Sequence, residues 1–365
     1  MDTIRQTKLI VDTKCIEHNI KELQKFVGEG VSVMPVIKAR GYGTGIGTQA
    51  DLFKKLGITL LAVAVIDEGI ALRERRFNGE IIVLNQPLAE EIEKALEYGL
   101  TLSVCIPDFI QKLNNCAKKS NKIANIHLEI DTGMSRTGIN PDDISTYIDM
   151  IKKLNNINLE GIYTHFSSSD CDTQYTEEQI SKFNKVVEIT KKEFNLKYIH
   201  SCNTAGILNF KHAHYNLVRP GISIYGHFPV PELKEKINLM PATVLKTKVA
   251  YIHDIKAGDS LSYGRSFIAK RDSIIATVPI GYADGVPRRY RGQVVINNNL
   301  ANIVGLVNMD SFMVDITDLT DVKIGTDVYI WDNVNITVEK VAEDCNTINY
   351  EILSSLTPRV VKEFI

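Results

Sequence analysis

Val31-Ser-Val-Met-Pro-Val-Ile37 leads directly into Lys38 and then into the glycine-rich stretch Ala39-Arg-Gly-Tyr-Gly-Thr-Gly45. A short apolar run bounded by glycines is typical of a buried β-strand. The pattern therefore predicts a lysine at the carboxyl end of a strand, where its amine can be held in a pocket and condense with a carbonyl compound. A single lysine at a strand end more often extends into solvent, so the choice between the two interpretations depends on the rest of the chain.

Short apolar runs of the same kind alternate with helix-period segments over the first two-thirds of the chain. We predict strands at 32–37, 60–65, 81–84, 101–105, 124–130, 158–163, 197–200 and 215–218. Alternating strands and helices indicate βαβ units and a parallel sheet. Eight such strands are the number that closes a (β/α)8 TIM-like barrel, which is the predicted fold; an open, doubly wound sheet is the alternative.

The character of the sequence changes after about residue 235. Short β-branched segments, separated by Gly, Asn and Asp, lie at 243–252, 259–268, 273–280, 293–297, 302–307 and 312–316. They predict a mostly β second domain, with Pro229-Val-Pro-Glu-Leu-Lys234 as the linker. We therefore expect a barrel domain over residues 1–235 and a β-rich domain over residues 236–365, with about the first ten residues free to pack against the β domain.

Composition is that of an ordinary globular protein, with 44% hydrophobic and 24% charged residues in a chain of 365. The formal net charge of −2 gives no general attraction to nucleic acid or to anionic membranes, so we expect neither as a partner. We see no signal peptide and no apolar run long enough to span a bilayer. The six cysteines form no Cys-x-x-Cys motif, which predicts free thiols in the cytoplasm and no metal site.

Polar and ionisable residues follow the predicted barrel strands, at the carboxyl ends where barrels carry their active sites. They are Lys38, Asn85, Asp131 with Arg136, His165, Asn203 and Arg219. A second hypothesis comes from Gly45-Ile-Gly-Thr-Gln-Ala50, which fits a dinucleotide-binding turn with Asp67 near the ribose-binding spacing. That hypothesis leaves Lys38 and the β-rich third of the chain unexplained.

Several separate motifs, in the same order along the chain, resemble those of the alanine racemase family, whose members use pyridoxal 5'-phosphate (PLP). In the barrel they are Val36-Ile-Lys-Ala-Arg-Gly-Tyr-Gly43, Asp131-Thr-Gly-Met-Ser-Arg-Thr-Gly138, Gly161-Ile-Tyr-Thr-His-Phe166, Cys202-Asn-Thr-Ala205 and Val218-Arg-Pro-Gly-Ile222. In the β-rich region they are Ser262-Tyr-Gly264, Gly281-Tyr-Ala-Asp-Gly285, Asn308-Met-Asp310 and Tyr350-Glu-Ile-Leu353. The resemblance implies a racemase that interconverts L- and D-alanine, supplies D-alanine for peptidoglycan, and works as a homodimer with shared active sites.

Roles for individual residues follow from the resemblance. It implies that Lys38 carries PLP as a Schiff base and serves as one catalytic base, while Tyr263 of a partner subunit is the other. It implies cofactor contacts for Tyr42, His165, Asn203, Thr204, Arg219, Gly221, Ile222 and Tyr350. Substrate contacts are implied for Arg136 and Met309, and supporting positions for Glu129, Asp310 and Tyr282.

Three positions depart from the family pattern. Glu129 stands where many members carry a carbamylated lysine, and we expect its own charge to hold Arg136. Asn308 replaces the usual cysteine and Thr44 the usual histidine, which leaves alanine, serine or a broader set of amino acids open as substrate. A PLP decarboxylase of the same architecture would place a cysteine near the substrate, and a non-catalytic PLP-binding protein would resemble the barrel alone.

Overall fold

The computed structural model describes residues 4–365, except for the side chains of residues 47 and 48. The chain forms two compact units. We call Ile16–Gly41 and Ile46–Met240 the barrel unit; the β unit consists of the residues up to Cys15, Tyr42–Gly45 and Pro241–Ile365. Within the described residues, no helix has the length and apolar character needed to cross a membrane.

Eight parallel strands form the barrel unit. They are β2 (Ser32–Val33), β3 (Leu60–Val63), β4 (Glu80–Val83), β5 (Thr101–Val104), β6 (Ala124–Ile130), β7 (Ile157–Thr164), β8 (Tyr198–His200) and β9 (Leu217–Val218). Their order is β2-β9-β8-β7-β6-β5-β4-β3, and a parallel bridge between Val36 and Ala62 joins the two ends of that order. The predicted (β/α)8 barrel is thereby confirmed, and the open sheet is excluded.

The first barrel strand is shorter than the predicted 32–37, since β2 ends at Val33. Pro35 has no N–H group to donate to a neighbouring strand, so it interrupts the ladder. The chain nevertheless stays extended beside its neighbours: Val36 N donates to Pro220 O at 2.8 Å and Ile37 N to Ala62 O at 2.9 Å. The backbone before Lys38 is therefore held on both sides.

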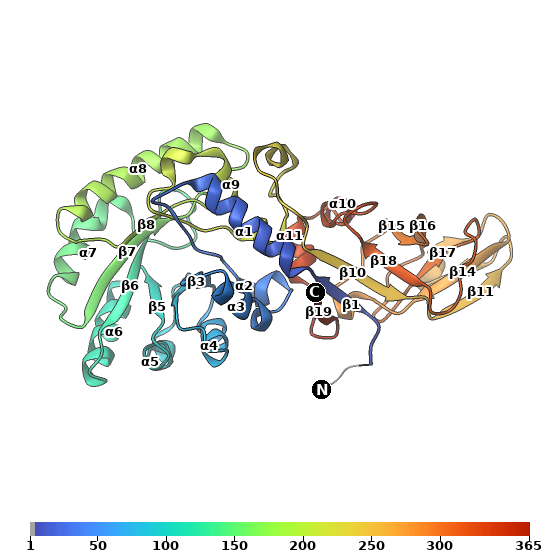
Figure 1. The fold of residues 1–365 in the computed structure, drawn as a ribbon, viewed down its shortest axis with the longest axis horizontal. Coiled ribbons are helices and arrows are strands. Elements are labelled where there is room, and N and C mark those ends of the chain that lie inside the picture. Colours follow the sequence, from blue (N-terminus) through green and yellow to red (C-terminus); the bar gives the residue numbers. More distant parts are fainter. Residues whose placement is uncertain (1–3) are drawn as a thin grey trace. The chain divides into compact units, whose positions relative to one another are not determined.

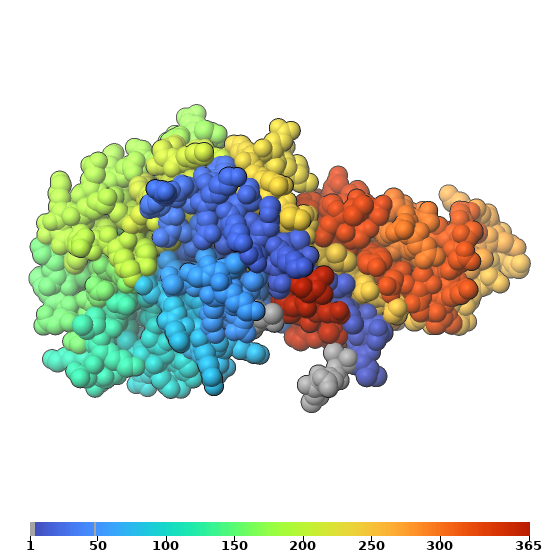
Figure 2. Space-filling view, viewed as in Figure 1, coloured from blue at the N-terminus to red at the C-terminus, as the bar shows by residue number. Residues whose placement is uncertain are grey.

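Helices surround these strands (Figure 1). A space-filling view from the same direction shows this face of the barrel unit (Figure 2). The helices are α1 (Thr13–Val27), α3 (Ile46–Lys55), α4 (Ile66–Glu74), α5 (Ile92–Glu97), α6 (Pro107–Lys119), α7 (Ile144–Ile151), α8 (Thr173–Lys191) and α9 (Thr204–Asn209). Inside, apolar side chains from four strand segments pack together: Met34, Val36, Leu60, Ala62, Ile82 and Leu217. The interior of the barrel is thus filled with side chains, and the carboxyl ends of the strands are where a site can form.

The β unit contains a nine-stranded sheet in the order β11-β14-β17-β16-β15-β18-β10-β1-β19. Its strands are β1 (Lys8–Val11), β10 (Thr243–Lys248), β11 (Tyr251–Ile255), β14 (Ser273–Val278), β15 (Gln293–Ile296), β16 (Asn299–Val304), β17 (Phe312–Asp315), β18 (Asp327–Trp331) and β19 (Val361–Phe364). Helices α10 (Val338–Asp344) and α11 (Asn349–Ser354) follow β18. Strand β1 pairs with β10 and β19, so the first and last described strands lie side by side in this sheet.

The predicted segment 259–268 is not a continuous strand. It forms β12 (Ser260–Leu261) and β13 (Phe267–Ile268), which pair around a short 3-10 turn at Tyr263–Arg265. Ser262, Gly264 and Arg265 have φ values of 69°, 65° and 51°, and such left-handed conformations end a strand. Tyr263 therefore lies at the tip of a hairpin.

Candidate active site

Lys38 begins a left-handed turn of the backbone. Ala39, Arg40 and Gly41 have φ values of 53°, 56° and 65°, and Gly41 N donates to Ile37 O at 2.9 Å. Residues other than glycine avoid this region because their Cβ atom approaches the backbone carbonyl. The carboxylate of Glu68 holds the turn from α4: it accepts from Arg40 N at 3.3 Å and from Ala64 N at 2.9 Å. The turn redirects the chain immediately after the lysine.

Four cationic or imidazole side chains influence one another electrostatically at the carboxyl ends of the barrel strands: Lys38, Arg136, His165 and Arg219. Burial lowers the pKa of the Lys38 amine, and the charges of Arg136 and Arg219 lower it further, while Glu68 opposes them. Burial also lowers the pKa of His165 well below its usual value, again with help from Arg219 and Arg136. An amine more easily deprotonated than usual, beside a neutral imidazole, is suited to proton transfer.

Arg219 is the centre of this group and is only 3% exposed. One terminal nitrogen, Nη2, donates to Thr164 O at 2.9 Å and Ser201 O at 3.0 Å. The other, Nη1, lies 2.8 Å from His200 Nδ1. Within the described residues no carboxylate forms an ion pair with this guanidinium, which is unusual for a buried charge.

His165 has one tautomer that fits its surroundings. Arg219 Nη2 lies 3.3 Å from His165 Nδ1, and a guanidinium can only donate hydrogen bonds. The Nδ1 atom of His165 is therefore an acceptor; because Nη2 has two hydrogens for three acceptors, Nδ1 shares one of them with a carbonyl oxygen. Because the ring is neutral, its proton is on Nε2, which makes Nε2–H a hydrogen-bond donor.

Small hydroxyl and backbone groups gather after the last two barrel strands. Thr204 Oγ1 accepts from Gly221 N at 3.2 Å and lies 3.1 Å from Ser223 Oγ. Ile222 begins the 3-10 turn Ile222–Tyr225 directly after Gly221. The amide oxygen of Asn203 caps α9 by accepting from Gly206 N at 2.9 Å. In barrels this region commonly binds phosphate, and hydroxyl and N–H groups are suitable donors to it.

The expected pairing of Glu129 with Arg136 is absent from the structure. Among the described residues no ion pair links the two side chains; Glu129 Oε2 instead accepts from Thr137 Oγ1 at 2.7 Å. Glu129 is buried on β6 next to Tyr163 of β7, whereas Arg136 is exposed on the following loop. The Glu129 carboxylate therefore has its hydrogen-bond partner in the loop after β6.

The remaining predicted residues lie in the β unit. Tyr42 is buried, and its ring centre lies 6.1 Å from that of Tyr350. Met309, Tyr282 and the hairpin-tip residue Tyr263 are exposed, Tyr263 to 72%. Tyr282 N donates to the carbonyl of Asn308, and Ala283 N to that of Met309, both at 3.0 Å. The loop carrying Met309 and the turn carrying Tyr282 are thus one hydrogen-bonded assembly.

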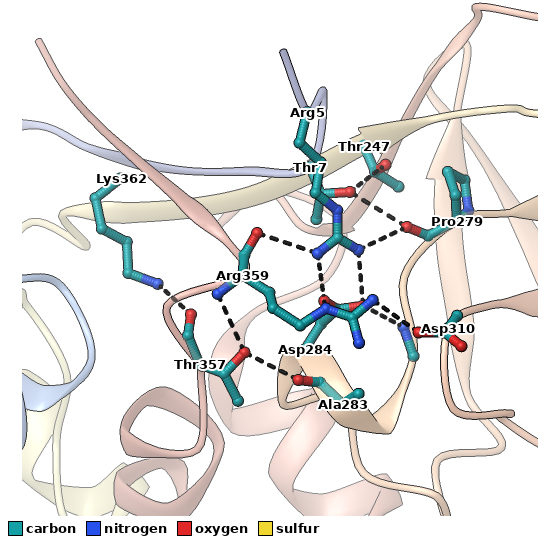
Figure 3. Close-up of polar contacts among 11 residues, drawn as sticks. Arg5, Thr7, Thr247, Pro279, Ala283, Asp284, Asp310, Thr357, Arg359 and Lys362 are labelled. Atoms are coloured by element: carbon teal, nitrogen blue, oxygen red, sulfur yellow. Dashed lines mark hydrogen bonds and ion pairs between the residues drawn. The ribbon is translucent and has the colours of Figure 1, made fainter. Parts of the chain in front are cut away.

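A cluster that the sequence did not predict holds this assembly in place (Figure 3). Asp284 is fully buried; its carboxylate accepts from Arg5 Nη1 at 2.5 Å and Nη2 at 2.9 Å, and lies 3.1 Å from Arg359 Nε. Arg359 also donates to Asp310 Oδ1 at 2.7 Å. Asp284 belongs to the recognised motif at 281–285, but both arginines come from the chain ends, where no local pattern marks them.

Comparison with known proteins matches both parts of the chain. Residues 11–229 match the alanine racemase N-terminal domain, and residues 242–364 match the alanine racemase C-terminal domain. The chain is 36% identical to an alanine racemase of Halothermothrix orenii, over 99% of this chain and 97% of that protein. It is also 36% identical to an alanine racemase of Methanococcus maripaludis, over 97% of each chain.

Solved structures give the same result. The chain is similar to alanine racemase of Clostridium difficile 630, with a TM-score of 0.94 and 32% identity over 98% of this chain and 95% of that one. It is equally similar to alanine racemase of Bacillus anthracis with bound L-Ala-P, with a TM-score of 0.94 and 32% identity over 100% and 96% of the two chains. The similarity therefore includes both units.

Proposed function

The chain belongs to the alanine racemase family, and we propose that it is a PLP-dependent isomerase that interconverts L- and D-alanine. The observation that carries the proposal is the group formed by Lys38, His165 and Arg219 at the carboxyl ends of the barrel strands, in which the pKa of the Lys38 amine is lowered. Such an amine condenses with an aldehyde more readily than an ordinary lysine. D-alanine for peptidoglycan would be its product.

The residues present fit PLP. Arg219 is a buried cation whose protein partners are all uncharged, which suits a ligand that brings a hydrogen-bond acceptor and negative charge. The Thr204 hydroxyl and the N–H groups around Gly221 and Ile222 would hold the phosphate, together with the Tyr42 and Tyr350 hydroxyls. Asn203 would support them by fixing the start of α9. When bound, PLP supplies an electron sink that makes the α-proton of an amino acid acidic.

Racemisation requires bases on opposite faces of the substrate α-carbon. Lys38 would exchange the proton of the D enantiomer. Burial and the charges of Arg136 and Arg219 lower its pKa, which favours the unprotonated amine that a base requires. Tyr263 would serve the L enantiomer. Tyrosine acts as a base only if its phenolate is stabilised, and the Nε2–H group of neutral His165 is a suitable donor for that purpose.

Arg219 would limit side reactions. With PLP bound, its guanidinium would donate a hydrogen bond to the pyridine nitrogen without giving up its proton. This would keep negative charge near the α-carbon and favour rapid return of the proton to that carbon. Arg136 and Met309 would orient the substrate carboxylate, while Asp310 supports the loop of Met309 and Tyr282 lines the approach.

We also propose a cytoplasmic homodimer in which the β-rich domain, predicted at residues 236–365 and including Tyr263, completes the site of a partner's barrel domain. Tyr263 supports this, because an exposed hairpin tip can reach another subunit. The described cysteines are all free thiols, in keeping with a reducing compartment.

Chiral analysis tests the activity directly. The protein, supplied with PLP, is incubated separately with L-alanine, D-alanine and L-serine, and enantiomers are resolved by chromatography. We expect alanine to approach an equimolar mixture from both directions, faster than serine. Formation of ethylamine and CO₂ from alanine would identify a decarboxylase instead, and no change in any incubation, with PLP bound, would refute the enzyme assignment.

A further inference from the structure

Two buried histidines extend the contacts of Arg219 through the interior of the barrel. Arg219 Nη1 lies 2.8 Å from His200 Nδ1, and His200 Nε2 lies 2.8 Å from His127 Nδ1. Both rings are fully buried. His127 belongs to β6 and His200 to β8, which are not neighbours in the sheet, so this contact crosses the interior. None of the roles proposed above uses either histidine.

The chemistry of the three groups sets the direction of every hydrogen bond. A guanidinium only donates, so His200 Nδ1 accepts, and the proton of neutral His200 is on Nε2. His200 then donates to His127 Nδ1, which places the His127 proton on Nε2 as well. Burial, followed by the charge of Arg219, lowers the pKa of His127 to about 3 and the pKa of His200 well below its usual value. Both rings are therefore neutral.

The barrel accommodates His127, the member of this hydrogen-bonded series that lies farthest from Arg219. Strand β7 is irregular opposite His127: Ile126 pairs with Leu159 and His127 with Gly161, so Glu160 is an extra residue. Such bulges redirect a side chain. The Glu160 carboxylate lies 4.0 Å from His127 Nε2, which has no hydrogen-bond partner among the described residues. Lys197 holds this carboxylate at 3.4 Å.

Two neighbours pack closely against the rings and favour their present orientations. A Cβ atom on Gly161 would lie 2.8 Å from His127 Cε1 and 2.9 Å from Nε2, so only glycine leaves space for this ring. Tyr163 stacks on His200, with ring centres 4.8 Å apart and planes 7° from parallel. The same tyrosine lies under the guanidinium, 5.2 Å from the Arg219 Cζ atom to the ring centre.

We propose that His127 is a positioning residue for Arg219: acting through His200, it keeps that guanidinium in one orientation with its full charge. If His127 could not accept, His200 Nε2–H would be a buried donor without a partner, and the ring would gain by turning or changing tautomer. Either change removes the acceptor from Arg219 Nη1. The effect of Arg219 on a ligand rests on the proposed function, but the positions of the protons on His127 and His200 do not.

Nitrogen NMR of the holoenzyme tests the proton order. With ¹⁵N-labelled histidine, the resonances of His127 and His200 are assigned by comparison with single variants of each. We expect both rings to be neutral at pH 7, with a bare Nδ1 and a protonated Nε2. An Nδ1–H tautomer or an imidazolium at either position would overturn the proposal, whether or not the protein is a racemase.

A matched pair of variants tests the positioning. His127→Asn keeps an acceptor close to the place of Nδ1, whereas His127→Leu has a similar size and none. We expect His127→Leu to lower racemisation about tenfold or more, the scale of one unsatisfied buried hydrogen bond. Its ratio of half-transamination to racemisation should rise, because a displaced guanidinium allows the pyridine nitrogen to be protonated.

The Asn variant is the control for packing and stability. It should keep the wild-type product ratio and the wild-type tautomer of His200. A product ratio does not depend on how much enzyme is folded, so a purely structural role for His127 would leave it unchanged in both variants. Equal ratios in wild type, Asn and Leu variants would refute the positioning role.

Discussion

The buried carboxylate of Asp284 makes Arg5 important for the stability of the β unit. Arg5→Ala removes two short contacts to Asp284 together with hydrogen bonds to Arg359 O at 3.0 Å and Pro279 O at 3.2 Å. Removing one partner of a buried ion pair typically costs 3–5 kcal/mol. Arg359 remains beside the carboxylate, so we take the lower end, about 3 kcal/mol, as the expected destabilisation of the β unit.

One residue makes the assay selective. Trp331 is the single tryptophan, is 1% exposed, and lies in β18 of the nine-stranded sheet, so its fluorescence follows unfolding of the β unit. With a urea slope of about 2 kcal/mol per M, a loss of 3 kcal/mol lowers the midpoint by about 1.5 M. Arg5→Lys, which keeps the charge but not the two-pronged contact, should fall between Arg5→Ala and wild type.

An exposed ion pair of the same unit supplies the control. Lys256 Nζ lies 2.8 Å from Asp272 Oδ2, but these side chains are 76% and 64% exposed. Lys256→Ala should therefore change the midpoint by less than about 0.5 M, since surface pairs contribute at most about 1 kcal/mol. If Arg5→Ala shifts the midpoint no further than Lys256→Ala, the inference that Arg5 and Asp284 stabilise this unit is wrong.

Lys38→Ala should abolish the absorbance of protein-linked PLP and nearly all turnover; absorbance that persists after dialysis would contradict the assignment. Tyr263→Phe should lower racemisation by about a hundredfold while PLP still binds, and mixing it with Lys38→Ala subunits should restore activity if sites are shared. Mixed dimers that form without recovery would argue against sharing. Acid should destabilise the barrel unit, because His127, His165 and His200 stay neutral when folded. Above about pH 6.5 these histidines are neutral in the unfolded chain as well, so the free energy of unfolding does not change through them. Below that pH, protons bind the unfolded chain first, and the free energy of unfolding falls by up to about 1.4 kcal/mol per pH unit for each histidine. Equal urea midpoints by circular dichroism at pH 7 and pH 5 would exclude this effect.

The parts of the fold that repeat were predictable from the sequence. Alternation of buried strands with amphipathic helices identified the barrel, since each strand there is a short apolar run between helices. Strand β18 was missed, although Val328 and Ile330 alternate with more polar residues and are fully buried. The hairpin at Tyr263 was predicted as one strand because its turn depends on left-handed residues, and Ser262 and Arg265 carry no such signal.

The candidate site also has a part that the sequence predicts and a part that it does not. Residues at strand ends were predictable, because the barrel brings Lys38, His165 and Arg219 to one face whatever the loops do. Contacts between distant segments were not: Arg5 reaches Asp284 across 279 positions of sequence. The expected pairing of Glu129 with Arg136 is not formed, because the Glu129 carboxylate accepts a hydrogen bond from the nearby hydroxyl of Thr137 instead.

The left-handed turn after Lys38 reverses an ordinary rule of protein engineering. Glycine in place of alanine usually weakens a fold, but Ala39 has φ 53° and ψ 48°, a conformation that glycine adopts without steric penalty. Ala39→Gly should therefore make the folded chain more stable by up to about 1 kcal/mol. A sequence selected for stability alone would place glycine at position 39. Alanine and arginine make the turn more rigid than glycine would, and so fix the direction of Lys38. At these few residues, higher stability and a fixed lysine therefore require different side chains.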